Sequence, residues 1–468
     1  MSIYDLDKTA VPLQELSRQK EYTHLVRTVL SARFGEPPRA YVHTYGCQGN
    51  VSDGERLQGM LAECGFAFTQ DLAQADFVLY NTCAVREHAQ DRVFGNVGAL
   101  KPLKRQKKHM KIALCGCMVQ QQHVADRLLR SYPFVDLIFG THVQHRLPEF
   151  LYKLYCTGEK VCEIPQSDGV IAEGIPVVRD SAFKAWLPIM YGCNNFCSYC
   201  IVPHVRGRER SRSTAVILEE ARQAVAAGYK EITLLGQNVN SYRGDTDFAG
   251  LLREINAIPG EFWIRFMTSH PKDCTPELID TIAACEKVER HLHLPFQSGN
   301  DRVLREMNRK YDRAKYLALA NYAKQTIPDL LLTSDVIVGF PGETAEEFED
   351  TLTLAQEVGF SSLFLFIFSP REGTRAAAMP DDTPREEKVR RFQALEKWQA
   401  QHSSQIAQSM RGKTVRVLCE EESRPGILTG KTSNAMTVEF PGAADRIGSF
   451  ADVRINESVG WTLKGESM

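Results

Sequence analysis

The feature that most constrains the fold is a repeated alternation of short apolar runs with segments of helical pattern. In the first third of the chain the apolar runs are "AYVHTYGC", "DFVLYNTC", "KIALCGC" and "VDLIFG". Each run is followed by a helical segment, for example "SDGERLQGMLAEC". An alternation of this kind predicts a parallel sheet covered by helices.

A second series of apolar runs follows the polar, turn-rich segment "QSDGVIAEGIP". These runs are "LPIMY", "EITLLG", "FWIRFM", "RHLHLP", "LTSDVIVG" and "LFLFIFS", and helical segments lie between them. About six βα units predict an incomplete barrel, with functional loops at the carboxyl ends of its strands. A long polar helix at about residues 384–410 is expected to close this domain.

The last segment changes to short alternating strands separated by Gly and Asn turns, which is typical of a small β-barrel. We therefore expect an α/β protein with four parts: an N-terminal extension (residues 1–38), a parallel-sheet βα domain (39–165), a partial (βα)6 barrel (180–410) and an all-β barrel (411–468). Small β-barrels often bind RNA. The eight basic and eight acidic residues of this barrel balance, so charge alone does not establish that role.

Bulk properties place the chain among ordinary globular proteins. A length of 468 residues predicts two or three domains, and a formal charge of −2 gives no support to nonspecific nucleic-acid or membrane binding. The N-terminus "MSIYDLDKTAVPLQ" lacks the apolar core of a signal peptide, and the most apolar run, "SSLFLFIFS", is far shorter than the roughly 20 residues of a membrane helix. We expect a cytoplasmic enzyme. The 13 cysteines are an odd number without a secretory signal, which favours metal ligands or buried thiols over disulfides.

Three cysteines stand close together in "MYGCNNFCSYCIVP", in a C-x3-C-x2-C spacing: Cys193, Cys197 and Cys200 (the loop triad). A [4Fe–4S] cluster usually takes four thiolates, so three would leave one iron open, as a catalytic metal requires. The alternative is zinc closed by His204 as the fourth ligand. The position of the loop after the first barrel strand favours the iron–sulfur cluster.

A second group of cysteines follows the strands of the N-terminal domain. Cys47, Cys83 and Cys117 (the auxiliary triad) each stand at the carboxyl end of a different predicted strand. Because parallel strands place these ends on one edge of the sheet, the three thiols can converge there. Cys115 competes with Cys117 in "CGC"; we prefer Cys117 because it begins the turn after the strand.

The loop triad, with Tyr199 before its last cysteine, resembles the motif of radical S-adenosylmethionine (SAM) enzymes. In those enzymes the open iron binds the methionine end of the cofactor, which is then cleaved to a 5′-deoxyadenosyl radical. "YGCQ", "NTCAVRE" and "CGCMVQ" resemble the N-terminal domain of the methylthiotransferases, and "LLGQNVNSY", "TSHPKD", "HLPFQSG" and "VIVGFPGET" resemble their radical domain. The C-terminal barrel is similar to the TRAM module. The chain is thus identified as a member of the radical SAM methylthiotransferase family, and "GQNVNSY" resembles its MiaB type.

The resemblance implies transfer of a methylthio group to carbon 2 of the isopentenylated adenosine next to the anticodon (position 37) of tRNA. It implies two [4Fe–4S] clusters, held by the auxiliary and loop triads as catalytic metal ligands, and SAM as methyl donor and radical source. The alternatives are a relative acting on threonylcarbamoyl-adenosine or a ribosomal protein and, from another class, a non-catalytic zinc RNA-binding protein.

The partners implied are tRNA carrying isopentenyladenosine, an electron donor such as flavodoxin or ferredoxin, and sulfur-supplying or cluster-assembly proteins. We expect a monomer without a membrane partner. The candidate cofactor-binding residues outside the two triads lie near the loop triad or at later strand ends: Tyr199, Arg206, Gln237, Asn238 and Ser298. The basic segment "KPLKRQKKH" is either a solvated helix end or a tRNA contact.

Overall fold

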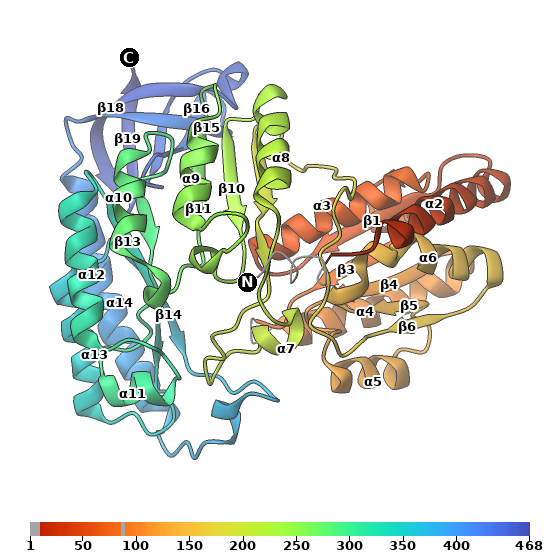
Figure 1. Ribbon diagram of the computed structural model, residues 1–468, viewed down its shortest axis with the longest axis horizontal. Helices are drawn as coiled ribbons and strands as arrows, with labels where there is room; N and C mark the ends of the chain where they lie inside the picture. The colour runs from red at the N-terminus through yellow and green to blue at the C-terminus, as the bar shows by residue number, and fades with distance from the viewer. Residues whose placement is uncertain (1–9, 86–88) are drawn as a thin grey trace. The chain divides into compact units, whose positions relative to one another are not determined.

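The computed structural model describes residues 10–85 and 89–468 (Figure 1). Its internal contacts divide the chain into two compact units. The first unit comprises Met1–Asp180 with two short later segments, Met190–Asn194 and Ile201–Ser211. The second unit comprises Ser181–Ile189, Asn195–Cys200 and Arg212–Met468. The predicted α/β class is confirmed in both units.

The first unit contains a six-stranded parallel sheet with the order β2-β1-β3-β4-β5-β6. Its strands are β1 (Arg39–Thr44), β2 (Ala67–Phe68), β3 (Phe77–Thr82), β4 (Lys111–Gly116), β5 (Leu137–Phe139) and β6 (Val161–Glu163). The four strands predicted from apolar runs are present. The sequence pattern missed β2, which has two residues, and β6, whose residues "VCE" do not form an apolar run. The order reverses between β1 and β3, so this pair is the topological switch point where ligands of open α/β sheets bind.

Helices cover both faces of this sheet: α2 (Leu13–Phe34), α3 (Gln48–Glu63), α4 (Ala89–Gln106), α5 (Gln122–Ser131) and α6 (Leu147–Tyr152). One apolar core joins α2, α3 and α6 to the sheet, and a second core joins α4 and α5 to it. Helix α2 lies in the segment expected to be an extension, yet its Val26 and Leu30 are fully buried in the first core. Residues 1–9 of that extension, and Arg86 and Glu87 of "NTCAVRE", lie outside the described residues.

The second unit contains six parallel strands in two three-stranded sheets, β7-β10-β11 and β12-β13-β14. They are β7 (Lys184–Pro188), β10 (Glu231–Leu235), β11 (Trp263–Phe266), β12 (His291–His293), β13 (Leu331–Val338) and β14 (Ser362–Ile367). An isolated parallel bridge between Ile264 and Val288 connects the two sheets, which gives the predicted incomplete barrel. Its helices are α8 (Thr214–Ala226), α9 (Phe248–Asn256), α10 (Pro276–Ala284), α11 (Asp301–Glu306), α12 (Arg313–Thr326), α13 (Ala345–Val358) and α14 (Arg385–Gln408).

The first barrel strand differs from the prediction. The apolar run "LPIMY" was expected to form it, but β7 ends at Pro188. Residues Met190–Tyr191 form β8, which pairs antiparallel with β9 (Arg210–Ser211) in the first unit. The prediction was wrong here because apolar periodicity does not show where a strand changes its hydrogen-bonding partner.

Five strands at the end of the chain form a closed barrel with the order β15-β16-β17-β19-β18, as predicted. They are β15 (Thr414–Arg424), β16 (Ile427–Thr432), β17 (Thr437–Pro441), β18 (Phe450–Val459) and β19 (Thr462–Ser467). The barrel packs on the strands of the same unit: Arg265 donates to the Thr432 carbonyl over 2.9 Å. The rings of Trp263 and Phe450 are 4.8 Å apart. No helix in the described part of the chain is both long enough and apolar enough to cross a membrane.

Candidate metal-cluster sites

The auxiliary triad lies at the topological switch point of the first unit. Cys47 is the N-cap residue of α3 after β1, Cys83 directly follows β3, and Cys117 directly follows β4. Because β1, β3 and β4 are neighbours in the parallel sheet, all three cysteines stand at its carboxyl edge. Cys83 and Cys117 are buried, whereas Cys47 is exposed, so the group opens toward solvent on one side.

Two glycines with positive φ allow the strand ends to approach each other. A Cβ on Gly46 (φ +109°) would lie 2.6 Å from the Cys83 sulfur, and a Cβ on Gly116 (φ +99°) would lie 2.4 Å from the Thr82 carbonyl oxygen. Neither distance is possible for a real side chain. The glycine before Cys47 and the glycine before Cys117 therefore let both turns close against the end of β3.

Asn50, in the first turn of α3, connects the three strand ends. Its Nδ2 donates to the carbonyls of Tyr45 (2.8 Å) and Thr82 (3.0 Å). Its Oδ1 lies 4.0 Å from the Cys47 sulfur and 3.7 Å from the Cys117 sulfur. Two sulfurs of the triad thus converge on one fully buried oxygen atom.

Arg206 adds a buried positive charge to this group from α7 (Val202–Arg206), which belongs to the first unit. Its Nε donates to the Cys117 sulfur over 3.0 Å and its Nη2 donates to Asn50 Oδ1 over 2.7 Å. The same Nη2 forms an ion pair with Asp53 at 2.7 Å. The sequence pattern placed Arg206 among the SAM-binding candidates; in the structure its partners are Cys117 of the auxiliary triad and two side chains of α3, Asn50 and Asp53.

The environments of Cys115 and Cys117 differ. Cys115 is fully buried in the apolar core between the sheet and α2, α3 and α6. Cys117 contacts Arg206 and packs with Ala84, Ile201 and Val205. Burial raises the pKa of the Cys117 thiol to about 12, and the Arg206 charge opposes this rise. A bound metal, which needs the thiolate, would supply the charge that favours deprotonation.

No group of three His, Cys, Asp or Glu side chains in the described residues is close enough to hold a single metal ion. The auxiliary triad offers three thiols beside a buried cation and opens to solvent on one side, which fits an anionic cluster with one exchangeable position.

The loop triad is divided between the two units. Cys193 belongs to the first unit, where its N–H donates to the Gly207 carbonyl over 3.1 Å. Cys197 and Cys200 belong to the second unit and form one turn, in which the Cys200 N–H donates to the Cys197 carbonyl over 2.9 Å. The structure thus brings Cys197 and Cys200 together, and places Cys193 four residues before Cys197 on the same loop.

The second-unit part of this loop is held by the segment after α11. Asn308 donates from Nδ2 to the carbonyls of Asn195 (3.2 Å) and Phe196 (2.9 Å). Arg309 donates from Nη1 to the Cys197 sulfur over 3.3 Å. The ring of Tyr199 packs into a small apolar core with Val303, Met307, Phe340, Phe368 and Ala376. Sequence reasoning missed Arg309, since it lies 112 residues from Cys197 and no local pattern marks it.

Buried polar atoms without hydrogen-bond partners gather at the carboxyl ends of β10, β11 and β12. They are Asn238 Oδ1, Ser269 Oγ, His270 Nε2 and Gln297 Oε1, on side chains that are at least nine-tenths buried. Burial lowers the pKa of His270 to about 2, so the ring is neutral. Its Nδ1 accepts from the Lys272 N–H, which leaves the ring proton on Nε2. This mixture of donors and acceptors at strand ends fits a polar ligand such as SAM.

The remaining candidates have varied environments. Ser298 is fully buried and its Oγ lies 3.3 Å from Thr351 Oγ1. Gln237 follows β10, next to Asn238. In the basic segment, Lys104 is paired with Asp136 at 2.7 Å, so its charge is already compensated. No contact described for these residues identifies a ligand.

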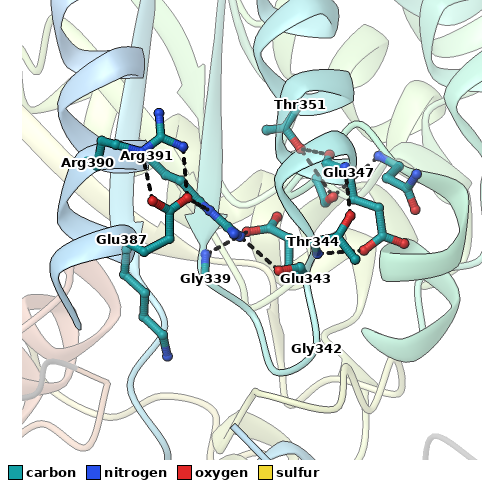
Figure 2. Close-up of polar contacts among 12 residues, drawn as sticks. Gly339, Gly342, Glu343, Thr344, Glu347, Thr351, Glu387, Arg390 and Arg391 are labelled. Atoms are coloured by element: carbon teal, nitrogen blue, oxygen red, sulfur yellow. Dashed lines mark hydrogen bonds and ion pairs between the residues drawn. The ribbon is translucent and has the colours of Figure 1, made fainter. Parts of the chain in front are cut away.

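The "GFPGET" segment forms a tight turn between β13 and α13 (Figure 2). The Gly339 N–H donates to Glu343 Oε2 over 2.7 Å, and Arg391 of α14 donates to the same oxygen over 2.9 Å. Thr344 and Glu347 form a capping box at the start of α13. The buried Glu343–Arg391 pair therefore ties this turn to α14, as Figure 2 shows.

Three regions of the chain match known families. Residues 187–355 match the Radical SAM superfamily, residues 39–140 match Uncharacterized protein family UPF0004, and residues 408–467 match the TRAM domain. Among solved structures, the radical S-adenosylmethionine methyltransferase TsrM from Kitasatospora setae is similar with a TM-score of 0.55 and 14% identity, over 73% of this chain and 77% of that one. That likeness shows the fold. The fold, the cysteine motif and the family match together define a radical SAM enzyme.

Curated relatives specify the family further. The chain is 48% identical over 461 residues to the tRNA-2-methylthio-N(6)-dimethylallyladenosine synthase of Acetivibrio thermocellus, which covers 97% of this chain and 96% of that protein. It is 46% identical over 434 residues to the enzyme of the same name from Clostridium tetani, covering 92% and 96%. The chain belongs to the family of tRNA-2-methylthio-N(6)-dimethylallyladenosine synthases. Its cofactors are accordingly [4Fe–4S] clusters and SAM. The names of both relatives refer to tRNA.

Proposed function

We propose that this chain transfers a methylthio group to carbon 2 of the isopentenylated adenosine adjacent to the anticodon of tRNA. The observation that carries the proposal is the convergence of Cys47, Cys83 and Cys117 at the switch point, on strand ends that do not carry the loop triad. A radical SAM enzyme that only forms a radical needs one cluster, whereas sulfur insertion needs a second metal centre that can present sulfur. The names of the curated relatives support the same substrate.

The C–H bond at carbon 2 of adenine is not acidic, so a general acid–base pair would not break it. When bound, the clusters and SAM supply the radical, the methyl group and the sulfur. We assign Cys193, Cys197 and Cys200 as ligands of the radical SAM cluster, and Cys47, Cys83 and Cys117 as ligands of the auxiliary cluster. The unpartnered polar atoms of Asn238, Ser269, His270 and Gln297 would orient the polar parts of SAM.

Four further features belong to this proposal. The reduced state of the clusters requires a one-electron donor such as flavodoxin or ferredoxin. Repeated turnover requires a sulfur-supplying or cluster-assembly protein. The C-terminal barrel would contact tRNA, and the enzyme would act as a cytoplasmic monomer.

The test is a reaction of the anaerobically reconstituted protein with isopentenylated tRNA, followed by mass spectrometry of the nucleosides. The methylthio product should appear only with SAM, a reductant and a sulfur source, and tRNA lacking the isopentenyl group should give none. Iron and sulfide per chain should fall by about half in Cys83→Ala and in Cys193→Ala. A colourless, zinc-loaded protein would refute the proposal in favour of a zinc RNA-binding protein.

A further inference from the structure

Each of the two cysteine triads contains one sulfur that accepts a hydrogen bond from a buried arginine. Arg206 donates to Cys117 of the auxiliary triad over 3.0 Å, and Arg309 donates to Cys197 of the loop triad over 3.3 Å. Both arginines are at least nine-tenths buried. They lie in different units and come from unrelated parts of the sequence. The same type of hydrogen bond, from a buried arginine to a cysteine sulfur, therefore occurs in both triads.

The two arginines differ in what compensates their charge. Arg206 forms an ion pair with Asp53 at 2.7 Å, and both side chains are less than 9% exposed. The net charge of this ion pair beside the Cys117 sulfur is therefore close to zero. Arg206 also donates to Asn50 Oδ1, so its guanidinium group is held in one orientation.

Arg309 has no carboxylate within ion-pair distance among the described residues. Its Nε donates to the Tyr311 hydroxyl over 2.9 Å, and its Nη2 donates to the Pro295 carbonyl over 2.8 Å. Both of these partners are uncharged. The Cys197 sulfur, as a thiolate, is therefore the group that can offset the charge of Arg309. A buried, uncompensated cation costs free energy, and an anionic group beside it recovers that cost.

A [4Fe–4S] cluster held by three thiolates is already anionic, and its one-electron reduction adds another negative charge. A cation that donates a hydrogen bond to a ligand sulfur stabilises the reduced state more than the oxidised state. Hydrogen bonds to sulfur and net charge are two of the levers by which proteins set cluster potentials. The interaction is strong when both groups are shielded from water.

We propose that Arg309 raises the reduction potential of the radical SAM cluster and that Arg206 raises that of the auxiliary cluster by a smaller amount, because Asp53 offsets the charge of Arg206. This inference rests on the assignment of the two triads under the proposed function. It makes Arg206 and Arg309 positioning residues, since each acts through a ligand sulfur. The uncompensated charge of Arg309 thus favours placing the electron on the cluster that must deliver it to SAM.

The experiment is a redox titration of the reconstituted full chain, followed by electron paramagnetic resonance. Each cluster is observed alone, in a Cys83→Ala background for the radical SAM cluster and a Cys193→Ala background for the auxiliary cluster. Arg309→Gln should lower the reduced-to-oxidised ratio of the radical SAM cluster at least tenfold at a fixed potential, which corresponds to about 59 mV for one electron. Arg206→Gln should lower the ratio of the auxiliary cluster by less than tenfold.

Asp53→Asn should change the ratio of the auxiliary cluster in the opposite direction, because it removes a negative charge and leaves Arg206 unchanged. It should raise the reduced-to-oxidised ratio of the auxiliary cluster, because the charge of Arg206 is no longer offset. Arg206→Lys and Arg309→Lys keep the positive charge. Each should give a reduced-to-oxidised ratio between those of the parent protein and the corresponding glutamine variant. Arg210→Gln is the matched control, since Arg210 is equally buried but donates to the backbone carbonyls of Asp168, Arg208 and Arg206 and not to sulfur. It should leave both ratios unchanged.

Iron content separates the possible failures. If the parent protein binds no iron, the proposed function itself fails. If the arginine variants bind full iron and their ratios match the parent, the inference is overturned. If Arg309→Gln and Arg309→Lys both lose iron, or if Asp53→Asn fails to raise the auxiliary ratio, the role of that arginine is structural and the inference is overturned for that cluster.

Discussion

Asn81 donates from Nδ2 to the main-chain carbonyl of Asn50 over 2.8 Å, and thereby joins the end of β3 to the first turn of α3. Asn50 in turn donates to carbonyls on both sides of that junction. These two fully buried amides hold Cys47 and Cys83 on neighbouring strand ends. The geometry of the auxiliary triad therefore depends on two side chains that are not themselves metal ligands.

Replacing Asn50 by Leu should abolish the auxiliary cluster and leave the radical SAM cluster intact. The change leaves the Tyr45 carbonyl without its donor, at a cost of about 1–3 kcal/mol for a buried group, whereas the Thr82 carbonyl keeps the Cys117 N–H at 2.9 Å. Iron per chain should fall by about half. Asn96→Ala is the control, because Asn96 donates to the Tyr45 hydroxyl in the same region and has no hydrogen bond to a cysteine among the described residues. Full iron content in Asn50→Leu would contradict this role.

Gly116→Ala should also prevent formation of the auxiliary cluster. Its φ of +99° is unfavourable for alanine, and the new Cβ would lie 2.4 Å from the backbone oxygen of Thr82, which cannot move without displacing β3. Gly158→Ala separates the effect of a positive φ from the effect of the steric clash. Gly158 has a φ of +76°, but a Cβ added there would have no atom within 4 Å. We expect Gly158→Ala to cost only about 1 kcal/mol and to retain full iron. Circular dichroism melting and iron analysis measure both effects.

The two cysteines of "CGC" should behave differently when replaced. Cys117→Ala should lose about half of the iron, whereas Cys115→Ala should retain all of it, because Cys115 is buried in the apolar core. The loss of one buried sulfur at Cys115 should reduce stability by about 1 kcal/mol. Equal iron loss in both variants would show that the ligand assignment is incomplete.

Glu55 should make the stability of the first unit depend on pH. Burial raises the pKa of this carboxyl to about 7, against an ordinary value of 4.5. The folded state therefore holds a proton that the unfolded state has already released. The free energy of unfolding should fall as the pH rises from about 4.5 to about 7, by about 3 kcal/mol, and then stay level. Glu55→Gln should remove this dependence in thermal melts of the metal-free protein between pH 5 and 8.

Two adjacent arginines of α14 allow the stability contribution of a buried ion pair at the turn after β13 to be compared with that of an exposed ion pair. Arg391 is buried with Glu343, while Arg390 is 62% exposed and pairs with Glu387 (Figure 2). Arg391→Ala should destabilise the protein by about 3–5 kcal/mol, because it leaves a buried carboxylate without its counter-charge. Arg390→Ala should cost less than about 1 kcal/mol. Chemical denaturation of both variants tests this difference, and similar losses would contradict it.

The sequence by itself determined most of the βα units, the two α/β regions, the C-terminal barrel and the positions of both triads along the chain. Apolar periodicity and strand length are local properties, so they can be read without knowing how the chain folds back. The convergence of Cys47, Cys83 and Cys117 could be predicted for a related reason: neighbouring parallel strands must end on the same edge of a sheet.

The tertiary structure alone decided the long-range side-chain contacts. Arg206 lies 89 residues from Cys117, and Arg309 lies 112 residues from Cys197. It also decided that α2 packs into the first core and that Met190–Tyr191 pair with β9. Burial and close packing select these contacts only after the backbone is in place, and no local pattern records which distant side chain will arrive.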